Sequence, residues 1–257
     1  MSIRIAIPEP SVDTEYNQRT LPSYLAALHS VGATAVVVPL HERPDRVAKL
    51  LASTQGVLLP GSRFDVDPQR YGEEPIAACG PADASRTAVD ELLLQDAFNL
   101  YKPIFGICHG TQTLNVWRNG SLIQDLPSVL HTPVDHSPGG ATQAHSISVS
   151  ANSRLAKIAG SVNDASTPQA GSQFVNSSHH QAIRTPGDNL RVSAVSPEDN
   201  VIEAVELDSH DHWVVAVQWH PERTYTSSAL SRALFAAFMH AVEAWQPRHI
   251  EESVSAT

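Results

Sequence analysis

The chain has 257 residues, of which 42% are hydrophobic and 17% are charged, an ordinary balance for a globular protein with a substantial core. The formal net charge is -10 and no run of Lys or Arg compensates for it, which argues against nucleic acid or an anionic membrane as the main partner. No stretch approaches the roughly 18 apolar residues of a membrane span, and the start of the chain lacks the pattern of a signal peptide. We therefore expect a cytoplasmic protein.

Strands and helices alternate in the first half of the sequence. Apolar and β-branched runs predict the strands, and apolar residues at helical spacing predict the helices. We expect strands at 3–7, 34–39, 56–59 and 103–106, a loop at 8–17, and helices at 22–31, 44–52, 86–100 and directly after residue 108. This order predicts a parallel sheet with right-handed crossovers and helices on both faces.

Cys108 lies between the last of these strands and its helix, flanked by Gly106 and Gly110. A nucleophile at a tight strand-to-helix turn is lifted above the sheet, and the N-terminus of the following helix stabilises a thiolate. The pattern on its own fits a buried structural cysteine equally well, so catalysis also requires a base elsewhere. The second cysteine, Cys79, lies in an Ala/Gly/Pro loop where no chemical role is expected, although a regulatory disulfide between the two stays open.

The second half of the sequence is richer in strands. Strands are expected at 145–150, 190–195, 201–207 and 213–218, a short helix at 153–159 and a closing helix at 227–245. These strands predict an antiparallel extension of the sheet or a subsidiary sheet. Gly/Ser/Pro/Asn-rich stretches at 137–142 and 159–172 are expected to be mobile loops. With no repeat and no clear boundary, residues 1–246 are predicted to form a single domain, and 247–257 a flexible tail.

His220 and Glu222 are the candidate partners of Cys108. They end the run WVVAVQWHPE at 213–222, where Pro221 favours an extended conformation at His220. Residues i and i+2 of an extended segment point to the same side, so both side chains can face one site. We expect His220 to take the thiol proton and Glu222 to orient and stabilise the imidazolium. The alternative is a surface His beside a surface Glu.

With these residues in view, the chain resembles class I glutamine amidotransferase-like γ-glutamyl hydrolases of the peptidase C26 type, and among them the bacterial γ-glutamyl-γ-aminobutyrate hydrolases. The resemblance extends over nearly the whole chain. Five blocks carry it, at 58–74, 103–116, 120–126, 174–183 and 217–222. It implies an α/β fold of the flavodoxin-like, class I glutamine amidotransferase type, with a mostly parallel central sheet flanked by helices. It also implies a cytoplasmic enzyme of polyamine catabolism.

The resemblance further implies a mechanism. Cys108 would attack the γ-carbonyl of a γ-glutamyl amide, and the resulting thioester would be hydrolysed with the help of His220 and Glu222. Backbone N–H groups of Gly61 and His109 would form the oxyanion hole, where each preorganised donor typically contributes about 3 kcal/mol. The residues expected at the glutamyl group are Gln112, Asn176, Ser177 and His179.

Several of these residues have plainer interpretations. Gln112 could be an exposed helix residue, and His179 and His180 could form a turn pair without a ligand. Three residues of the loop at 64–73 are expected to hold its shape rather than touch substrate; they are Asp65, Asp67 and Tyr71.

No metal and no cofactor are expected. The residues His131, Asp135, His136 and His145 could be imagined as a metal site, but their spacing matches no standard ligand pattern and the resemblance implies no metal. The expected partner is a small-molecule γ-glutamyl substrate, with no nucleic acid and no membrane. A homodimer is left open.

The chain departs from the family pattern at two places. His109 stands where the subgroup usually has arginine after the nucleophile, and Thr87 replaces an acid that usually follows Arg86. A histidine is only partly charged near neutral pH, so we expect substrate affinity to depend on pH through His109.

Three functions are consistent with this sequence. The first is a free-standing hydrolase of γ-glutamyl amides such as γ-glutamyl-γ-aminobutyrate. The second is a glutaminase subunit that supplies ammonia to a separate synthetase. The third, an inactive scaffold protein, is disfavoured because Cys108, His220 and Glu222 are all present.

Overall fold

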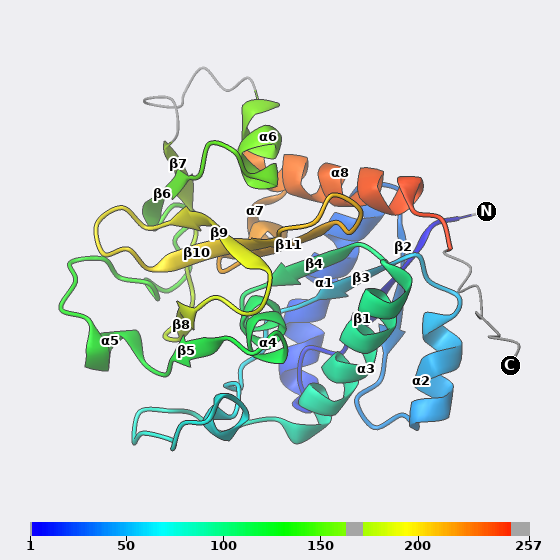
Figure 1. Cartoon of the computed structure of the whole chain (residues 1–257), viewed down its shortest axis with the longest axis horizontal. Coiled ribbons are helices and arrows are strands. Elements are labelled where there is room, and N and C mark those ends of the chain that lie inside the picture. The colour runs from blue at the N-terminus through cyan, green and yellow to red at the C-terminus, as the bar shows by residue number, and fades with distance from the viewer. Residues whose placement is uncertain (1, 163–171, 248–257) are drawn as a thin grey trace, which may run out of the picture.

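A continuous sheet joins the strands of both halves of the chain (Figure 1). The computed structural model describes residues 2–162 and 172–247. The sheet has 11 strands, in the order β2-β1-β3-β4-β11-β10-β9-β6-β7, with β8 branching from β10 and β5 pairing with β8. Its parallel part consists of β1 (Arg4–Pro8), β2 (Thr34–Val38), β3 (Gly56–Leu59), β4 (Ile104–Ile107) and β11 (Val214–Val217).

The antiparallel extension is part of this same sheet. β10 pairs antiparallel with β11, with Ala204 opposite Val217, so the second half of the chain continues the sheet that the first half begins. The remaining strands pair antiparallel with one another. They are β5 (Ser121–Ile123), β6 (His145–Val149), β7 (Ser172–Val175), β8 (Ala182–Thr185), β9 (Leu190–Val195) and β10 (Ile202–Leu207).

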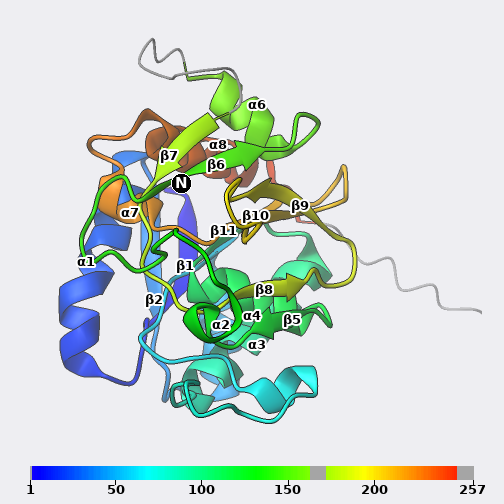
Figure 2. The same cartoon turned by 90° about the vertical axis from the view of Figure 1, so that its left-hand side faces the viewer.

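Helices cover both faces of the sheet, as the apolar strands predict (Figures 1 and 2). One core cluster packs α1 (Thr14–Ser30), α6 (Arg154–Gly160) and α8 (Ala229–Ala244) against one face. A second packs α2 (Pro44–Leu51), α3 (Ala84–Leu100) and α4 (His109–Trp117) against the other. Short helices α5 (Leu126–Val129), α7 (Pro221–Thr224) and the 3-10 turn η1 (Pro68–Tyr71) lie in the connections.

Most predicted elements are confirmed, with three kinds of error. The extended conformation expected through His220–Glu222 is wrong beyond His220, because Pro221 suits the first turn of a helix and begins α7. Helix α1 begins at Thr14 rather than at residue 22, because the Asp13 carboxylate caps it by accepting a hydrogen bond from the Tyr16 N–H. The prediction placed Pro22 at the helix start, whereas it lies inside the helix. Strands β5, β7 and β8 were not predicted, since three or four residues show too little periodicity.

Two predicted flexible segments fall mainly outside the described residues. These are 163–171 within the loop predicted at 159–172, and 248–257 within the predicted tail. Among residues 2–162 and 172–247, no helix combines the length and the apolar character needed to cross a bilayer.

Helix α4 approaches the sheet so closely that two glycines are required. A methyl group on Gly110 would come within 2.2 Å of the Leu59 carbonyl oxygen on β3, and one on Gly106 within 2.9 Å of the Ala216 side chain on β11. Neither neighbour is the free end of a flexible side chain. Gly110 therefore sets how closely α4 approaches β3. A methyl group on Gly106 would also come within 3.3 Å of the Gly110 carbonyl oxygen at the start of α4.

We expect Gly110→Ala to destabilise the protein by about 1–3 kcal/mol or more, because the added methyl group meets a backbone oxygen. Gly160→Ala is the matched control: this exposed helical glycine has no atom within 4 Å of an added methyl group. Its helix should gain up to about 1 kcal/mol. Chemical denaturation of both variants measures the difference, and equal stabilities would contradict the close approach of α4.

Candidate active site

Cys108 lies at the turn between β4 and α4, at the carboxyl end of the parallel strands. Its backbone has φ 52° and ψ −108°, a conformation that non-glycine residues rarely adopt. The Cys108 N–H donates to the Val217 carbonyl oxygen (2.8 Å), so the neighbouring strand β11 holds the turn. The predicted nucleophile elbow is therefore present, at the edge of the sheet where α/β proteins commonly bind ligands.

His220 and Glu222 lie beside Cys108 because β11 runs parallel to β4. Ile107 is opposite Val217 in this pairing, and His220 follows Val217 by three residues. The His220 Nδ1–H donates to Glu222 Oε1 at 2.7 Å, and both side chains are almost wholly buried. With Nδ1 protonated, His220 Nε2 remains available as a base. Cys108 and His220 line one pocket, and the three residues form a Cys-His-Glu arrangement.

The charge state of His220 follows from its neighbours. Burial lowers the pKa of His220, but Glu222 and Cys108 outweigh burial and raise that pKa to about 9. The imidazole is therefore protonated at neutral pH when it faces a thiolate. Such an ion pair is the reactive form of a catalytic cysteine.

Asn176 was expected to bind the glutamyl group, but its side-chain amide is hydrogen-bonded to the backbone of His220. Its side-chain Nδ2 donates to the His220 carbonyl oxygen, and its Oδ1 accepts from the His220 N–H, both at 2.8 Å. These two bonds fix the backbone from which the imidazole projects. The geometry makes Asn176 a residue that positions His220, in place of the predicted substrate contact.

The two predicted oxyanion donors both lie near Cys108. A methyl group on Gly61 would come within 3.0 Å of His220 Cε1 and 3.6 Å of Cys108 Cβ. The Gly61 N–H, however, donates to the Tyr24 hydroxyl at 3.0 Å, so an oxyanion would have to compete with that acceptor. The His109 N–H belongs to the first turn of α4, where N–H groups have no partner within the helix. An oxyanion role for either residue stays a prediction.

His109 does not carry the partial charge expected of it. The side chain is buried, and burial together with the nearby positive Arg86 lowers the pKa of His109 well below its ordinary value. The imidazole is therefore neutral near pH 7, since the charged form would have to leave water in the vicinity of a second cation. The predicted pH-dependent affinity through His109 is thus not supported.

The remaining predicted substrate residues are buried and largely occupied by protein partners. Gln112 Nε2 donates to the Gln181 carbonyl oxygen (3.1 Å) and to Gln218 Oε1 (3.2 Å), so the alternative of an exposed helix residue is wrong. Ser177 Oγ donates to the His136 carbonyl oxygen at 2.6 Å. Of this group, Gln112 lines the Cys108 pocket, together with His179.

Arg86 is a functional residue that sequence reasoning did not identify. Its side chain is fully buried and paired with Asp90, the Nε–Oδ1 distance being 2.8 Å. The guanidinium also donates from Nη1 to the carbonyl oxygens of Pro10 (2.8 Å) and Gly61 (3.3 Å) and from Nη2 to that of Pro60 (2.7 Å). Arg86 thereby holds the ends of β1 and β3 at the edge of the pocket. The sequence did contain a signal for this role, because Arg86 belongs to the charge pattern of the family that the chain resembles.

His180 also has a structural role. Its Nε2 contacts Asp65 Oδ1 at 2.9 Å and its Nδ1 contacts Asp125 Oδ1 at 3.0 Å. Bonding to Asp65 is the main cause that raises the pKa of His180 to about 9. The bond to His180 helps to hold the loop of Asp65, but both residues also line the Cys108 pocket, so the expectation that Asp65 does not touch substrate stays a prediction.

Comparison with known proteins places these residues in a family. The Peptidase C26 family model matches residues 5–222, a span that includes Cys108, His220 and Glu222. The chain belongs to the Peptidase C26 family. A gamma-glutamyl-gamma-aminobutyrate hydrolase of Escherichia coli (strain K12) is 34% identical over 239 residues, which cover 89% of this chain and 87% of the relative. This family membership and these relatives make the protein a hydrolase.

A second relative is longer than this chain. It is a Mycobacterium tuberculosis protein named as a candidate glutamine amidotransferase, 36% identical over 212 residues. The match covers 82% of this chain but 65% of that protein, so the chain spans less than two thirds of its length.

Solved structures with low sequence identity share the fold. A Thermoplasma acidophilum protein described as one of the subunits of a GMP synthase has a TM-score of 0.61 and 15% identity, covering 95% of both chains. The glutaminase domain of Trypanosoma brucei CTPS has a TM-score of 0.58 and 17% identity, covering 95% of this chain and 96% of that one. They confirm the predicted glutamine amidotransferase-type fold.

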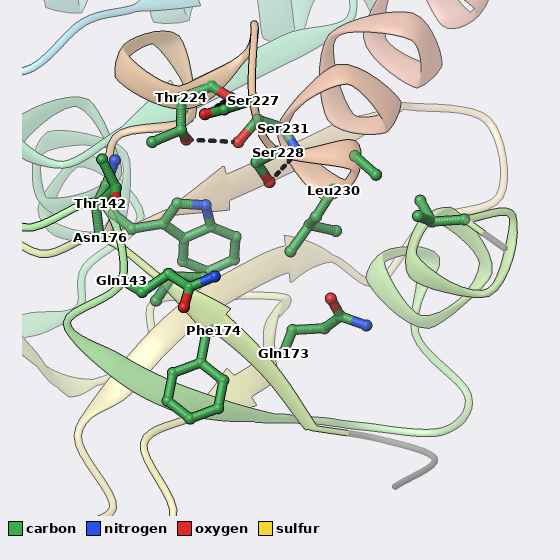
Figure 3. Close-up of a pocket in the computed structure, with 14 residues that line it drawn as sticks. Thr142, Gln143, Gln173, Phe174, Asn176, Thr224, Ser227, Ser228, Leu230 and Ser231 are labelled. Atoms are coloured by element: carbon green, nitrogen blue, oxygen red, sulfur yellow. Dashed lines mark hydrogen bonds between the residues drawn. The ribbon is translucent and has the colours of Figure 1, made fainter. Parts of the chain in front are cut away.

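The Peptidase C26 protein also has a second hollow, between β7 and the start of α8 (Figure 3). Phe174, Gln143 and Leu230 line it, and the hydroxyls of Thr224 and Ser231 are hydrogen-bonded at 2.9 Å on its wall. None of its described lining residues has a titratable side chain. The Cys108 pocket is therefore the candidate site for covalent chemistry.

We expect His220→Gln to slow the alkylation of Cys108 by iodoacetamide at pH 7 by roughly 10- to 30-fold. A free thiol is only about 3% ionised at this pH, and an imidazole that accepts the thiol proton increases the reactive fraction, which glutamine cannot do. Peptide mass spectrometry after timed quenching measures the rate at each cysteine separately. Cys79 is the internal control, because burial and Asp65 raise its pKa to about 11 and its reaction should stay slow in both proteins. Equal Cys108 rates would exclude the ion pair.

Proposed function

We propose that the protein hydrolyses the γ-glutamyl amide bond of a γ-glutamylated amine, such as γ-glutamyl-γ-aminobutyrate, through a thioester on Cys108. The observation that carries this proposal is the placement of Cys108 and His220 in one pocket, with Glu222 bonded to His220 at 2.7 Å. The named activity of the Escherichia coli relative supports the choice of substrate.

In the acylation step, His220 accepts the Cys108 proton and the thiolate attacks the γ-carbonyl carbon of the substrate. Glu222 stabilises the imidazolium that forms, as the short Nδ1–Oε1 bond allows. Collapse of the tetrahedral intermediate breaks the C–N bond while His220 returns the proton to the leaving amine. The product of this step is a γ-glutamyl thioester on Cys108 and a free amine.

In the deacylation step, water takes the place of the amine. His220 accepts a proton from the water as its oxygen attacks the thioester carbonyl, and the C–S bond then breaks. The thiolate recovers its proton through His220, and glutamate is released. The same residue thus acts as base and as acid in both steps.

Two arginines are the proposed partners of the substrate carboxylates. Arg63 and Arg223 both line the Cys108 pocket, and their side chains are 54% and 41% exposed. A guanidinium matches the geometry of a carboxylate. γ-Glutamyl-γ-aminobutyrate carries one carboxylate on the glutamyl group and one on the leaving amine, so a pair of cations suits it.

The purified protein, alone and without added metal, is expected to release glutamate from at least one γ-glutamyl amine. Cys108→Ala should lower kcat/KM by at least about 1000-fold because the thioester cannot form. Cys79→Ser is the matched control and should retain activity. Coupled detection of glutamate with glutamate dehydrogenase measures the rates across a panel of γ-glutamyl conjugates.

Two outcomes would contradict the proposal. Full activity of Cys108→Ala would exclude the covalent mechanism. If the protein hydrolysed glutamine but no γ-glutamyl amine, and did so only when a synthetase was present, the result would favour the alternative of a glutaminase subunit that supplies ammonia.

The pH dependence of KM tests the neutral state of His109. Between about pH 6 and pH 8, wild type and His109→Gln should show parallel KM profiles, since a histidine with a strongly lowered pKa gains no proton there. If the KM of the wild type decreased as the pH was lowered below 7, while the KM of His109→Gln stayed constant, the result would show that His109 becomes charged in that range.

A further inference from the structure

Three histidines and a glutamate gather in the interior of the sheet extension. His136 lies in the loop before β6, His145 begins β6, His179 lies between β7 and β8, and Glu203 belongs to β10. Their side chains are between 0% and 4% exposed. One nitrogen or oxygen atom of each lies within 4.8 Å of all the others. β6, β7 and β10 belong to the same end of the sheet (Figure 2).

The distances in this His–Glu cluster match those around a metal ion. Glu203 Oε1 lies 3.3 Å from His136 Nδ1, 3.4 Å from His145 Nε2 and 3.6 Å from His179 Nε2. Zinc bonds to nitrogen and oxygen are about 2.0–2.2 Å long, and a tetrahedron with such bonds has its ligand atoms about 3.3–3.6 Å apart. The three nitrogen-to-oxygen distances fit three of the six edges of such a tetrahedron, and all four atoms lie within 4.8 Å of one another.

The outer nitrogen of each ring is held by an oxygen acceptor. Such bonds place a proton on the outer nitrogen of a neutral imidazole and leave a lone pair on the inner one, as in metal-binding histidines. The three bonds are His136 Nε2 to Asp199 Oδ2 at 2.9 Å, His145 Nδ1 to the Ser146 carbonyl at 3.1 Å and His179 Nδ1 to the Gln181 carbonyl at 2.9 Å.

The inner atoms of the cluster have no hydrogen-bond partner. His136 Nδ1, His145 Nε2, His179 Nε2 and both carboxylate oxygens of Glu203 are buried without one. Lone pairs and a carboxylate that face one another in a buried site are strongly disfavoured unless a cation lies between them or protons are shared among them. We propose that His136, His145, His179 and Glu203 bind a structural zinc ion.

The donor set favours zinc in a structural role. Three imidazoles and one carboxylate suit zinc, and four protein ligands leave no open position for a substrate. The four ligands come from separate segments, so the ion would fasten the loop before β6 and the β7–β8 connection to β10. Ser137 and His179, on those two segments, also line the Cys108 pocket. The ion would thereby fix one wall of the pocket without entering the reaction, and the proposal does not depend on the identity of the substrate.

The spacing of the four ligands along the sequence does not reveal this site. His131 and Asp135, which the sequence suggested beside His136 and His145, are not part of the cluster. The two missing ligands follow far along the chain, at positions 179 and 203, on segments that only strand pairing brings together.

The test is the metal content and zinc affinity of tag-free protein produced with zinc in the medium. We expect mass spectrometry of the metals to find about one zinc per chain. Removal of zinc by dipicolinate should lower Tm, and added ZnCl2 should restore it. Replacement by CoCl2 should give the visible absorption of tetrahedral cobalt(II).

Variants distinguish zinc binding at this site from zinc binding by other histidines, and loss of zinc from a general loss of stability. Asp199 contacts the cluster through the outer nitrogen of His136 and also accepts hydrogen bonds from Thr132 Oγ1 and the Val201 N–H. Asp199→Asn should weaken zinc binding by roughly 10- to 100-fold. His145→Ala and Glu203→Gln should abolish it. His240→Ala, on an exposed helix position, and Glu206→Gln, which loses a buried carboxylate on the same strand that pairs with Arg191, should retain full zinc binding.

Two results would overturn the proposal. One is wild-type protein that contains no metal and whose Tm responds to neither dipicolinate nor ZnCl2, which would mean that protons neutralise the cluster. The other is unchanged zinc affinity in both His145→Ala and Glu203→Gln, which would place the ion elsewhere.

Discussion

The parallel pairing of β4 with β11 is the constraint on which the candidate active site depends. The bond from the Cys108 N–H to the Val217 carbonyl joins the two strand ends and holds the cysteine in its unusual conformation. Since β11 continues into His220 and Glu222, the same pairing that places the thiol also places its base. Residues more than 100 positions apart thus meet because two strands end at the same edge of the sheet, with Gly106 and Gly110 leaving room for α4.

Arg86 also stabilises the edge of the sheet at which Cys108 lies. A buried guanidinium is costly unless it is paired and hydrogen-bonded, and here Asp90 and three backbone carbonyl groups accept four hydrogen bonds from Arg86. Because the carbonyl groups belong to the ends of β1 and β3, the cation connects two strand ends that are not themselves neighbours of Cys108 in sequence. Its charge also helps to keep His109 neutral. One buried arginine therefore contributes both to the geometry and to the electrostatics of the pocket.

The sequence predicted most strands of the sheet well. The bounds of Gly56–Leu59 in the parallel part and of Leu190–Val195 in the antiparallel extension were correct, because apolar runs and flanking turns are local signals. Cys108, His220 and Glu222 could be proposed as candidate site residues for the same reason, since each lies in a short motif that is visible in the sequence. Arg86 was not, since a charged side chain in a helical pattern usually faces solvent. The partners of Asn176 and of the three clustered histidines depend on strand pairing between distant segments, which no local pattern reports.

The segment from Asn176 to Gln181 shows how the pocket wall is held. Asn176 bonds to the backbone of His220, His179 faces Glu203, His180 joins Asp65, and the Gln181 carbonyl accepts from Gln112. Adjacent residues are thus tied to the base, to the His–Glu cluster, to the opposite loop and to helix α4. A segment with so many partners cannot shift at one residue without moving the others. Of the residues that resemble substrate ligands in sequence, Asn176 holds the backbone of His220, whereas Gln112, Ser177 and His179 contact other protein groups.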